Sequence, residues 1–399
     1  MIALSQMPES SGIRFVATLI PLNEPILERI ANPKAFEQDA ARRILEVMRR
    51  IDLQAEAKLL RLISSNPDRP LPPQMTDRIL DLVDTFSDGP RLVPVLMQIF
   101  RTANPYLRAR LSLSIGKHHR NKDWLDDRMR DPDPRVRANV VEANWLQKDE
   151  AAVKLFSAAL RDPHHRVIGN GAVGLHHAGD NRCLKVFSEL LSHPEPNSRA
   201  AGLWAVGHIQ DTRFQHRIAT LTEDQQMIVR RSFDVASTRL KRVLEIREQQ
   251  PKLKLTLIKA TRDSLPPQPT PYGPEPLLPL FRNHVFLEVK TPEGVPIQGM
   301  KSLQFHVFEN DHAILDYSVQ ERTKYITPGT YDIYFDAATR TKELNGPPTQ
   351  RHLKIVILTD SASGEHDTHD FGEPEPKPEA TDSQPEPVAH AWEAFKPKM

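Results

Sequence analysis

Three groups of residues in this sequence have types and spacings that could support chemistry. Residues Gly169–Gly174 have the spacing G-x-G-x-x-G, with which a backbone can cradle a dinucleotide pyrophosphate. Imidazoles brought onto one edge could hold a metal ion or an anion, and the candidates are His118, His119, His176, His177 and His208. A row of arginines could follow a phosphate backbone, and the candidates are Arg108, Arg137, Arg199 and Arg230.

The local context of the glycines and histidines favours structural roles. A dinucleotide fingerprint should follow a buried strand, but these glycines follow the polar segment Asp162–Arg166, so helix packing is the favoured interpretation. Adjacent histidines on a helix point about 100° apart, so a pair such as His176 and His177 cannot easily chelate one ion. His177 and His208 share one register, but solvent-exposed or helix-capping histidines are expected.

A repeat of 31 residues must position these side chains. The segments Asp131–Ala138, Asp162–Gly169 and His193–Ala200 each begin with a polar residue and proline and continue into a helix pattern. Small residues recur downstream at fixed positions, as close helix stacking requires: Ala138, Gly169 and Ala200, then Ala143, Gly174 and Ala205. Second helices, such as residues 151–160, lie between the copies, so each unit is predicted to be helix, turn, helix.

The repeat extends in both directions. Val229-Arg230-Arg231 aligns one period further on, and Leu107-Arg108-Ala109 takes the same register 29 residues before Val136-Arg137-Ala138. Arg231 places a charge where the inner copies have a small residue, which suits a terminal repeat facing water.

These residues resemble the HEAT family, specifically the short HEAT-like repeats of phycobilisome lyases, over about residues 102–240. The resemblance implies an α-solenoid in which the repeated arginine pairs with a turn aspartate, here Asp131, Asp133 or Asp162. Ile168 replaces this arginine in one copy and interrupts the row. The alternative, contact with phosphates as in HEAT-like DNA glycosylases, stays open because Arg135 and Arg166 could form a basic edge.

After about residue 250 the apolar pattern alternates, which predicts short strands with one buried face and a small antiparallel β-sandwich of immunoglobulin-like type. The alternating runs centre on Leu255, Leu287, Phe305, Ile333 and Ile355. Residues 284–320 also resemble the β segment that flanks bacterial von Willebrand factor A domains, through Val285–Val289, Gly294–Met300 and Phe305–Asp311. The Asp-x-Ser-x-Ser metal motif of that family is missing, so no metal site is implied.

Composition limits the class of protein. Lys plus Arg (53) and Asp plus Glu (52) nearly cancel, which argues against a general binder of nucleic acids or membrane surfaces. One cysteine, Cys183, excludes an intramolecular disulfide framework and fits a reducing compartment. The sequence contains no apolar run long enough to span a bilayer and no signal-peptide pattern at its start, so we expect a cytoplasmic location without membrane insertion.

The predicted fold class is α + β multidomain: a HEAT-like α-solenoid, then a small antiparallel β-sandwich and a disordered C-terminal tail. The boundaries are residues 1–32 for an N-terminal extension, 33–250 for the solenoid, 251–360 for the sandwich and 361–399 for the acidic, proline-rich tail. A proline-rich linker at 264–280 interrupts the sandwich.

The predicted function is a non-enzymatic scaffold or assembly factor that binds one or more proteins through the solenoid surface and the β domain. One alternative is a nucleic-acid-binding HEAT protein, and another, by analogy with the phycobilisome lyases, is a cofactor or pigment lyase or chaperone. We expect no catalytic, metal-binding or cofactor-binding residues. The candidates for partner binding are Arg135, Arg166, His176, His177, His208 and the tail aromatics Trp392 and Phe395.

Overall fold

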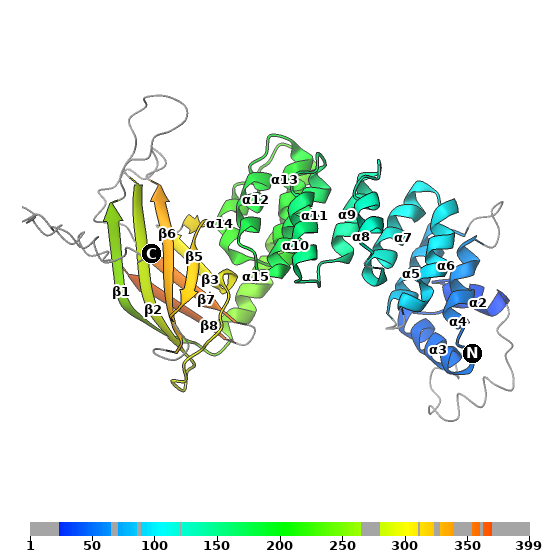
Figure 1. Ribbon diagram of the computed structural model, residues 1–399, viewed down its shortest axis with the longest axis horizontal. Coiled ribbons are helices and arrows are strands. Elements are labelled where there is room, and N and C mark those ends of the chain that lie inside the picture. Colours follow the sequence, from blue (N-terminus) through cyan, green and yellow to red (C-terminus); the bar gives the residue numbers. More distant parts are fainter. Residues whose placement is uncertain are drawn as a thin grey trace, which may run out of the picture.

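The fold is given by a computed structural model that describes residues 24–64, 71–85, 89–119, 121–264, 280–309, 312–322, 328–338, 353–359 and 362–368. Helices form an extended run that leads from α2 to α15, and a β-sandwich lies at the other end of the molecule (Figure 1). The predicted order of solenoid and sandwich is confirmed.

Helices α2 to α6 share a hydrophobic core, to which Leu111 and Ile115 of the following helix also contribute. These five helices are α2 (Glu24–Ala31), α3 (Gln38–Ile51), α4 (Ala55–Arg61), α5 (Pro73–Asp84) and α6 (Gly89–Thr102). Helix α2 corrects the predicted N-terminal extension at 1–32, because its Leu27 and Ile30 are buried in this core. Eight residues give too short a pattern to be recognised as a helix from sequence.

Four helix pairs and a final long helix follow. The first helices of the repeats, which we call the A helices, are α7 (Pro105–His118), α9 (Pro134–Ala143), α11 (His165–Ala178), α13 (Pro196–Ile209) and α15 (Met227–Glu248). The second helices are α8 (Lys122–Arg128), α10 (Glu150–Ala159), α12 (Arg182–Leu191) and α14 (Gln215–Ala219). Each A helix packs on the next one along the row.

The repeated turn starts helix α9 by satisfying its free N–H groups. The Asp131 carboxylate accepts from the Asp133 N–H, and the Asp133 carboxylate accepts from the Arg135 N–H as the N-cap. Pro134 occupies the first turn, where no backbone donor is needed. Positions 162, 193 and 224 repeat the first of these contacts through Asp162, His193 and Asp224.

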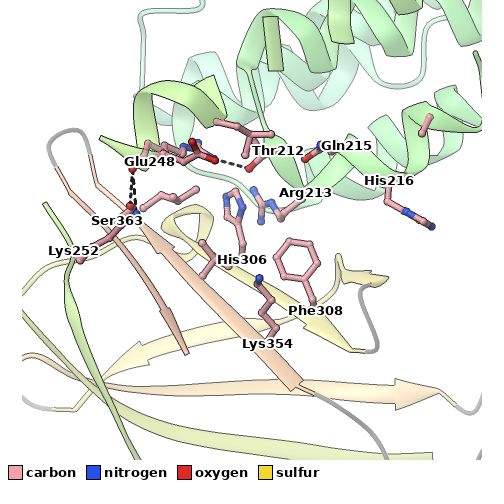
Figure 2. A pocket seen from close by; sticks show the side chains of 15 residues that line it. Thr212, Arg213, Gln215, His216, Glu248, Lys252, His306, Phe308, Lys354 and Ser363 are labelled. Carbon is pink, nitrogen blue, oxygen red and sulfur yellow. Dashed lines mark hydrogen bonds between the residues drawn. The ribbon is translucent and has the colours of Figure 1, made fainter. Parts of the chain in front are cut away.

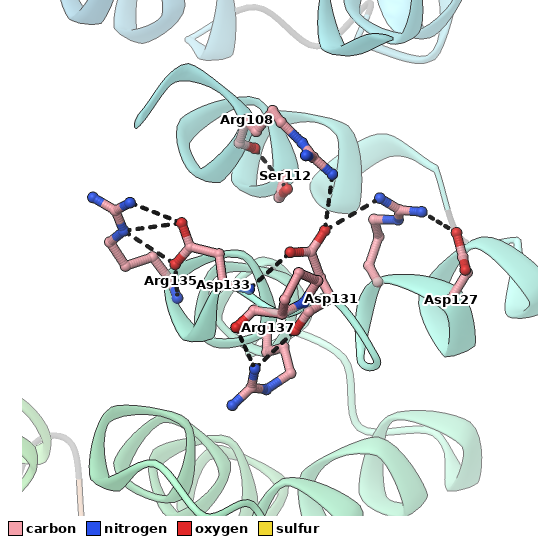
Figure 3. A network of polar contacts seen from close by, with 9 residues as sticks. Arg108, Ser112, Asp127, Asp131, Asp133, Arg135 and Arg137 are labelled. Carbon is pink, nitrogen blue, oxygen red and sulfur yellow. Dashed lines mark hydrogen bonds and ion pairs between the residues drawn. The ribbon is translucent and has the colours of Figure 1, made fainter. Parts of the chain in front are cut away.

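The repeated arginines connect each turn to the next. Arg137 donates through Nη1 to the carbonyl of Asp131 in its own turn, at 2.8 Å, and forks onto Asp162 of the next turn at 2.7 and 2.8 Å. Arg199 repeats this geometry with the His193 carbonyl and Asp224. Arg108 reaches Asp131 at 3.1 Å (Figure 3). The predicted pairing with turn aspartates is therefore confirmed for Asp131 and Asp162.

In one repeat, both residues of the arginine–aspartate contact are replaced by other residue types. An arginine at 168 would reach position 193, by the same step of 25 residues that joins Arg137 to Asp162, but the chain has Ile168 and His193 there. Ile168 carries no charge that would need an acidic partner at position 193. Asn170 on the same helix still donates to the Ala138 carbonyl at 2.8 Å and holds α11 against α9.

The sandwich consists of two antiparallel four-stranded sheets in the orders β1-β2-β6-β5 and β4-β3-β7-β8. The strands are β1 (Lys254–Ser264), β2 (Leu280–Lys290), β3 (Phe305–Glu309), β4 (His312–Ile314), β5 (Ser318–Glu321), β6 (Thr330–Ala338), β7 (Leu353–Leu358) and β8 (Ser363–Thr368). Alternate residues of both sheets, such as Leu287, Ile333 and Ile355, form the buried layer between them.

Strand β8 corrects the predicted start of the tail at 361. Its sequence, SGEHDT, contains no apolar residue, so it gives no alternating signal, yet it pairs with β7 from Leu353↔Thr368 to Leu358↔Ser363. Most of the predicted linker and the tail beyond residue 368 lie outside the described residues.

A buried ion pair joins the last repeat to the sandwich. Arg213, with a fully buried side chain, forks onto Asp211 at 2.6–3.1 Å and donates to the Tyr317 hydroxyl at 2.6 Å. The same hydroxyl lies 2.5 Å from the Phe305 carbonyl oxygen on β3. At the end of α15, Leu253 donates to the Ser363 carbonyl and Ser363 donates to the Pro251 carbonyl, which fixes the start of β1 beside β8.

Two histidines of this junction are held neutral. Burial, opposed by nearby Asp211, lowers the pKa of His176 to about 4. Burial and Arg213 lower the pKa of His306 well below its ordinary value. For Asp211, burial acts to raise the pKa, but Arg213 and the histidines outweigh it and the pKa is lowered. The expectation that His176 is exposed or a helix cap is wrong, because its Nε2 faces Asp211 at 3.9 Å.

Replacing Arg137 by methionine should lower the free energy of unfolding by about 2–4 kcal/mol, because Asp162 would lose its partner while remaining largely buried. Arg135→Met is the matched control, since Arg135 is exposed and pairs with Asp133 of its own turn, and it should cost much less than Arg137→Met. Urea unfolding measures both variants. Equal costs would contradict the structural role of the inter-repeat contact.

The free energy of unfolding should fall as the pH is lowered from about 6.5 to about 4. In this range the unfolded chain protonates both junction histidines, while the folded chain keeps them neutral, so protons favour unfolding. Each histidine contributes up to about 1.4 kcal/mol per pH unit. His176→Gln should flatten the dependence measured by urea unfolding at several pH values. An unchanged slope in His176→Gln would refute this origin.

Candidate functional site

The A helices form a groove on one face of the solenoid. Its volume is about 360 Å³, and α9, α11, α13 and α15 all contribute to it. We call it the A-helix groove, and it is lined by Glu142, His165, Arg166, Asn170, Asn197, Ala200, Ala201, Trp204 and Ile228. Polar side chains therefore surround an apolar floor. On this floor the small residues Ala200 and Ala201 leave space beside the Trp204 indole ring.

Four aromatic rings gather at this face of the solenoid. This aromatic cluster consists of Trp145, His177, Trp204 and His208, with ring centroids 4.9–6.2 Å apart where they touch. The Trp145 indole N–H donates to the Asn170 carbonyl at 2.9 Å, which ties the cluster to the groove. Trp204 belongs to both and is 39% exposed, so the groove presents a large aromatic surface to solvent.

Small residues determine how closely the helices approach beneath this surface. A Cβ at Gly174 would lie 2.5 Å from the Phe156 ring, and one at Gly116 would lie 2.7 Å from the Ala143 Cβ. A Cβ at Gly169 would meet nothing closer than the Trp204 ring at 3.8 Å. The G-x-G-x-x-G spacing therefore lies inside helix α11 and serves helix packing, as the local sequence context indicated.

The charges at the groove are partly neutralised. Burial raises the pKa of Glu142, and Arg166, which lines the same groove, acts in the opposite direction. Burial lowers the pKa of both His177 and His208, so the histidine side of the aromatic cluster is predominantly uncharged near neutral pH. The groove thus combines aromatic area with a mixed polar rim.

The structure separates the residues predicted to bind partners. Arg166 lines the groove, and His177 and His208 belong to the aromatic cluster, with ring centroids 6.2 Å apart as their shared register indicated. Arg135 lies on the turn before α9 and forks onto Asp133, while His176 faces the junction with the sandwich. Trp392 and Phe395 lie outside the described residues.

Sequence reasoning missed Trp145, Glu142 and the junction pair Asp211–Arg213. Trp145 lies just after the end of α9, and the equivalent positions of the other repeats do not hold a tryptophan. The junction pair gave a weak signal, an Asp-x-Arg string directly after a repeat helix.

The residues that could support other chemistry do not assemble for it. Within the described parts of the chain, no group of three or more His, Cys, Asp or Glu side chains is arranged to hold a metal ion. Cys183 is buried, and burial raises the pKa of its thiol far above the ordinary value, which keeps it protonated. None of the described helices combines the length and hydropathy needed to cross a bilayer.

These features define a helical-repeat protein of the α-solenoid class with an appended β-sandwich. Residues 93–174 match the family model described as HEAT repeats, which confirms the predicted HEAT repeats in this segment. The match covers α6 to α11 and includes the Arg137–Asp162 contact. A search of curated proteins found no match.

Comparison with solved structures finds matches of low similarity. Human deoxyhypusine hydroxylase in complex with glycerol is 14% identical, with a TM-score of 0.29, over 60% of this chain and 95% of that one. Kap121p is 14% identical, with a TM-score of 0.33, over 59% of this chain and 31% of that one. The Pseudomonas fluorescens alkylpurine DNA glycosylase AlkC, bound to DNA containing an abasic site analog, is 12% identical, with a TM-score of 0.24. The match covers 87% of this chain and 97% of that one. At these scores the likenesses carry no argument about activity.

Gly174→Ala should destabilise the protein by about 1–3 kcal/mol, because the added methyl would collide with the buried Phe156 ring. Gly169→Ala is the control at the first glycine of the same string. It should be neutral or stabilise by up to about 1 kcal/mol through helix propensity, since its Cβ has ordinary contacts. Thermal unfolding distinguishes them, and an equal loss in both variants would argue against a packing role.

Proposed function

We propose that this protein is a non-enzymatic scaffold that binds a partner protein in the A-helix groove. The observation that carries the proposal is the exposed Trp204 ring beside the aromatic cluster, with Arg166 at the rim. Tryptophan, tyrosine and arginine are enriched among the residues that dominate binding energy at protein interfaces. The cluster is also pre-ordered by ring stacking, which reduces the entropy lost on binding.

The surface next to the groove supports the same proposal. Met227 and Ile228 on α15 are 56% and 50% exposed, and Ile228 lines the groove itself. Apolar side chains rimmed by polar ones are typical of surfaces that bind proteins. A partner helix or extended segment could contact α9, α11, α13 and α15 at once. Such an extended binding surface is what a row of stacked repeats provides.

The nucleic-acid alternative has less support because most of the repeated arginines are already bound within the protein. Arg108, Arg137 and Arg199 meet turn aspartates, and Arg230 donates to the Asp224 carbonyl at 2.5 Å. A protein that follows a nucleic-acid backbone needs cations that can pair with phosphates. Among the arginines singled out from the sequence, only Arg166 lines the groove.

A pull-down with the full chain tests this proposal. The wild-type protein should retain a protein partner at stoichiometric amount and independently of nuclease, and Trp204→Ala should weaken that binding about 30-fold, as expected for an interface hot spot. Ile258→Ala, an exposed apolar position on β1, is the matched control and should bind as the wild type does. Retention of nuclease-sensitive material alone, or equal binding by Trp204→Ala, would contradict the proposal.

A further inference from the structure

A second cavity lies away from the A-helix groove, between the last repeat and the sandwich. Its volume is about 560 Å³, within the range of small-molecule sites. One wall comes from the 3-10 turn η3 (Thr212–Phe214), α14 and α15, and the other from β3, β7 and the start of β8. Figure 2 shows side chains from both domains converging on this space, which we call the junction cleft.

Basic side chains dominate the lining of the junction cleft. They come from separate elements and comprise Arg213, His216, Arg247, Lys252 and Lys354, and the neutral imidazole of His306 lies among them, whereas Glu248 is the acidic residue of the lining. Arg213 is neutralised by Asp211. The inward convergence of cations on a concave surface concentrates positive potential there.

Two of these cations have polar contacts but no carboxylate partner. The Arg247 Nη1 donates to the Thr212 hydroxyl at 2.6 Å, and the Lys252 Nζ donates to the Arg247 carbonyl at 3.3 Å. Neither side chain forms an ion pair within the part of the chain that the structure describes. Burial, together with nearby Arg213, lowers the pKa of Arg247 despite the opposing effect of Asp211, so its cationic form is only partly compensated within the protein. An anion in the cleft would supply the remaining counter-charge.

Apolar side chains lie on both walls of the cleft, among the basic ones. Leu244 on α15 and Phe308, Val356 and Leu358 on the second sheet line it together with the basic residues. An inorganic ion alone would leave this apolar lining unused. The lining therefore suits a ligand that combines an anionic group with a flat or apolar body.

The two walls are fixed relative to each other before any ligand binds. The Arg213–Asp211 pair and the Tyr317 hydroxyl connect the floor of the cleft to β3, and the backbone contacts of Leu253 and Ser363 close its edge. A site whose polar groups are held in place loses little entropy when a ligand binds.

From the converging cations and the apolar side chains, we propose that the junction cleft binds a small phosphorylated molecule with an aromatic body, of the size of a nucleoside diphosphate. Arg247 and Lys252 contact the phosphates, and Phe308 packs against the body. This ligand site is independent of partner binding in the A-helix groove.

Isothermal titration calorimetry with the full chain tests the proposal, with ADP, pyrophosphate, sulfate and adenosine as probes. ADP should bind, more weakly as salt is added, and pyrophosphate should bind less tightly than ADP. Sulfate and adenosine should bind at least tenfold more weakly than ADP. Absence of ADP binding, or adenosine binding as tight as that of ADP, would overturn the phosphate site, and pyrophosphate binding as tight as that of ADP would overturn the role of the apolar side chains.

Variants then locate the binding. Arg247→Gln and Lys252→Gln should each weaken ADP binding about tenfold or more through loss of a charge-assisted hydrogen bond. Lys241→Gln removes an exposed cation of α15 that does not line the cleft and should bind ADP as the wild type does. Lys252 is exposed, so Lys252→Gln remains informative if Arg247→Gln fails to fold, which its thermal unfolding midpoint shows. Wild-type affinity in Lys252→Gln, or in a folded Arg247→Gln, would refute the assignment.

Discussion

A charged side chain can enter the interior of this protein only where an acceptor is already in place, because removing an unpaired charge from water costs several kcal/mol. This constraint determines much of the architecture. Arg78 on α5 is buried against the carbonyls of Ile30, Phe36 and Glu37. Arg137 and Arg199 bind the turns of successive repeats, and Arg213 binds Asp211 under the sandwich.

The same constraint gives the solenoid its regular spacing. An arginine that binds its own turn six residues back and the next turn 25 residues ahead spans one 31-residue period, so each contact fixes the position of two turns at once. Packing of small residues alone would allow the A helices to slide along one another. At positions 168 and 193, where the contact is absent, α11 and α13 are held together by helix packing, and the Asn170 amide adds a bond from α11 to the Ala138 carbonyl of α9.

The sequence was most informative where a pattern repeats. The 31-residue period predicted the helix pairs and the arginine partners, and the alternating runs predicted the principal strands, because both patterns reflect burial of a regular face. Strand β8 and helix α2 were missed, since one has no apolar residues and the other is very short. Trp145, Glu142, Asp211 and Arg213 act through contacts between segments far apart in the chain or at the ends of helices, and single-sequence periodicity contains no information about such contacts.

The pairing of Ser363 with Pro251 and Leu253 has a consequence for the order in which the protein forms. Helices of the solenoid contact near neighbours in sequence, so they can assemble while later segments are still being synthesised. In the sandwich, in contrast, Leu253, which directly precedes β1, pairs with Ser363, more than a hundred positions further along the chain. Arg213 has its full set of partners only when Tyr317 is in place. During translation, the end of the solenoid therefore leaves the ribosome with Arg213 still lacking Tyr317 as a partner and with β1 still lacking its neighbouring strands. Both remain exposed until most of the sandwich has been synthesised.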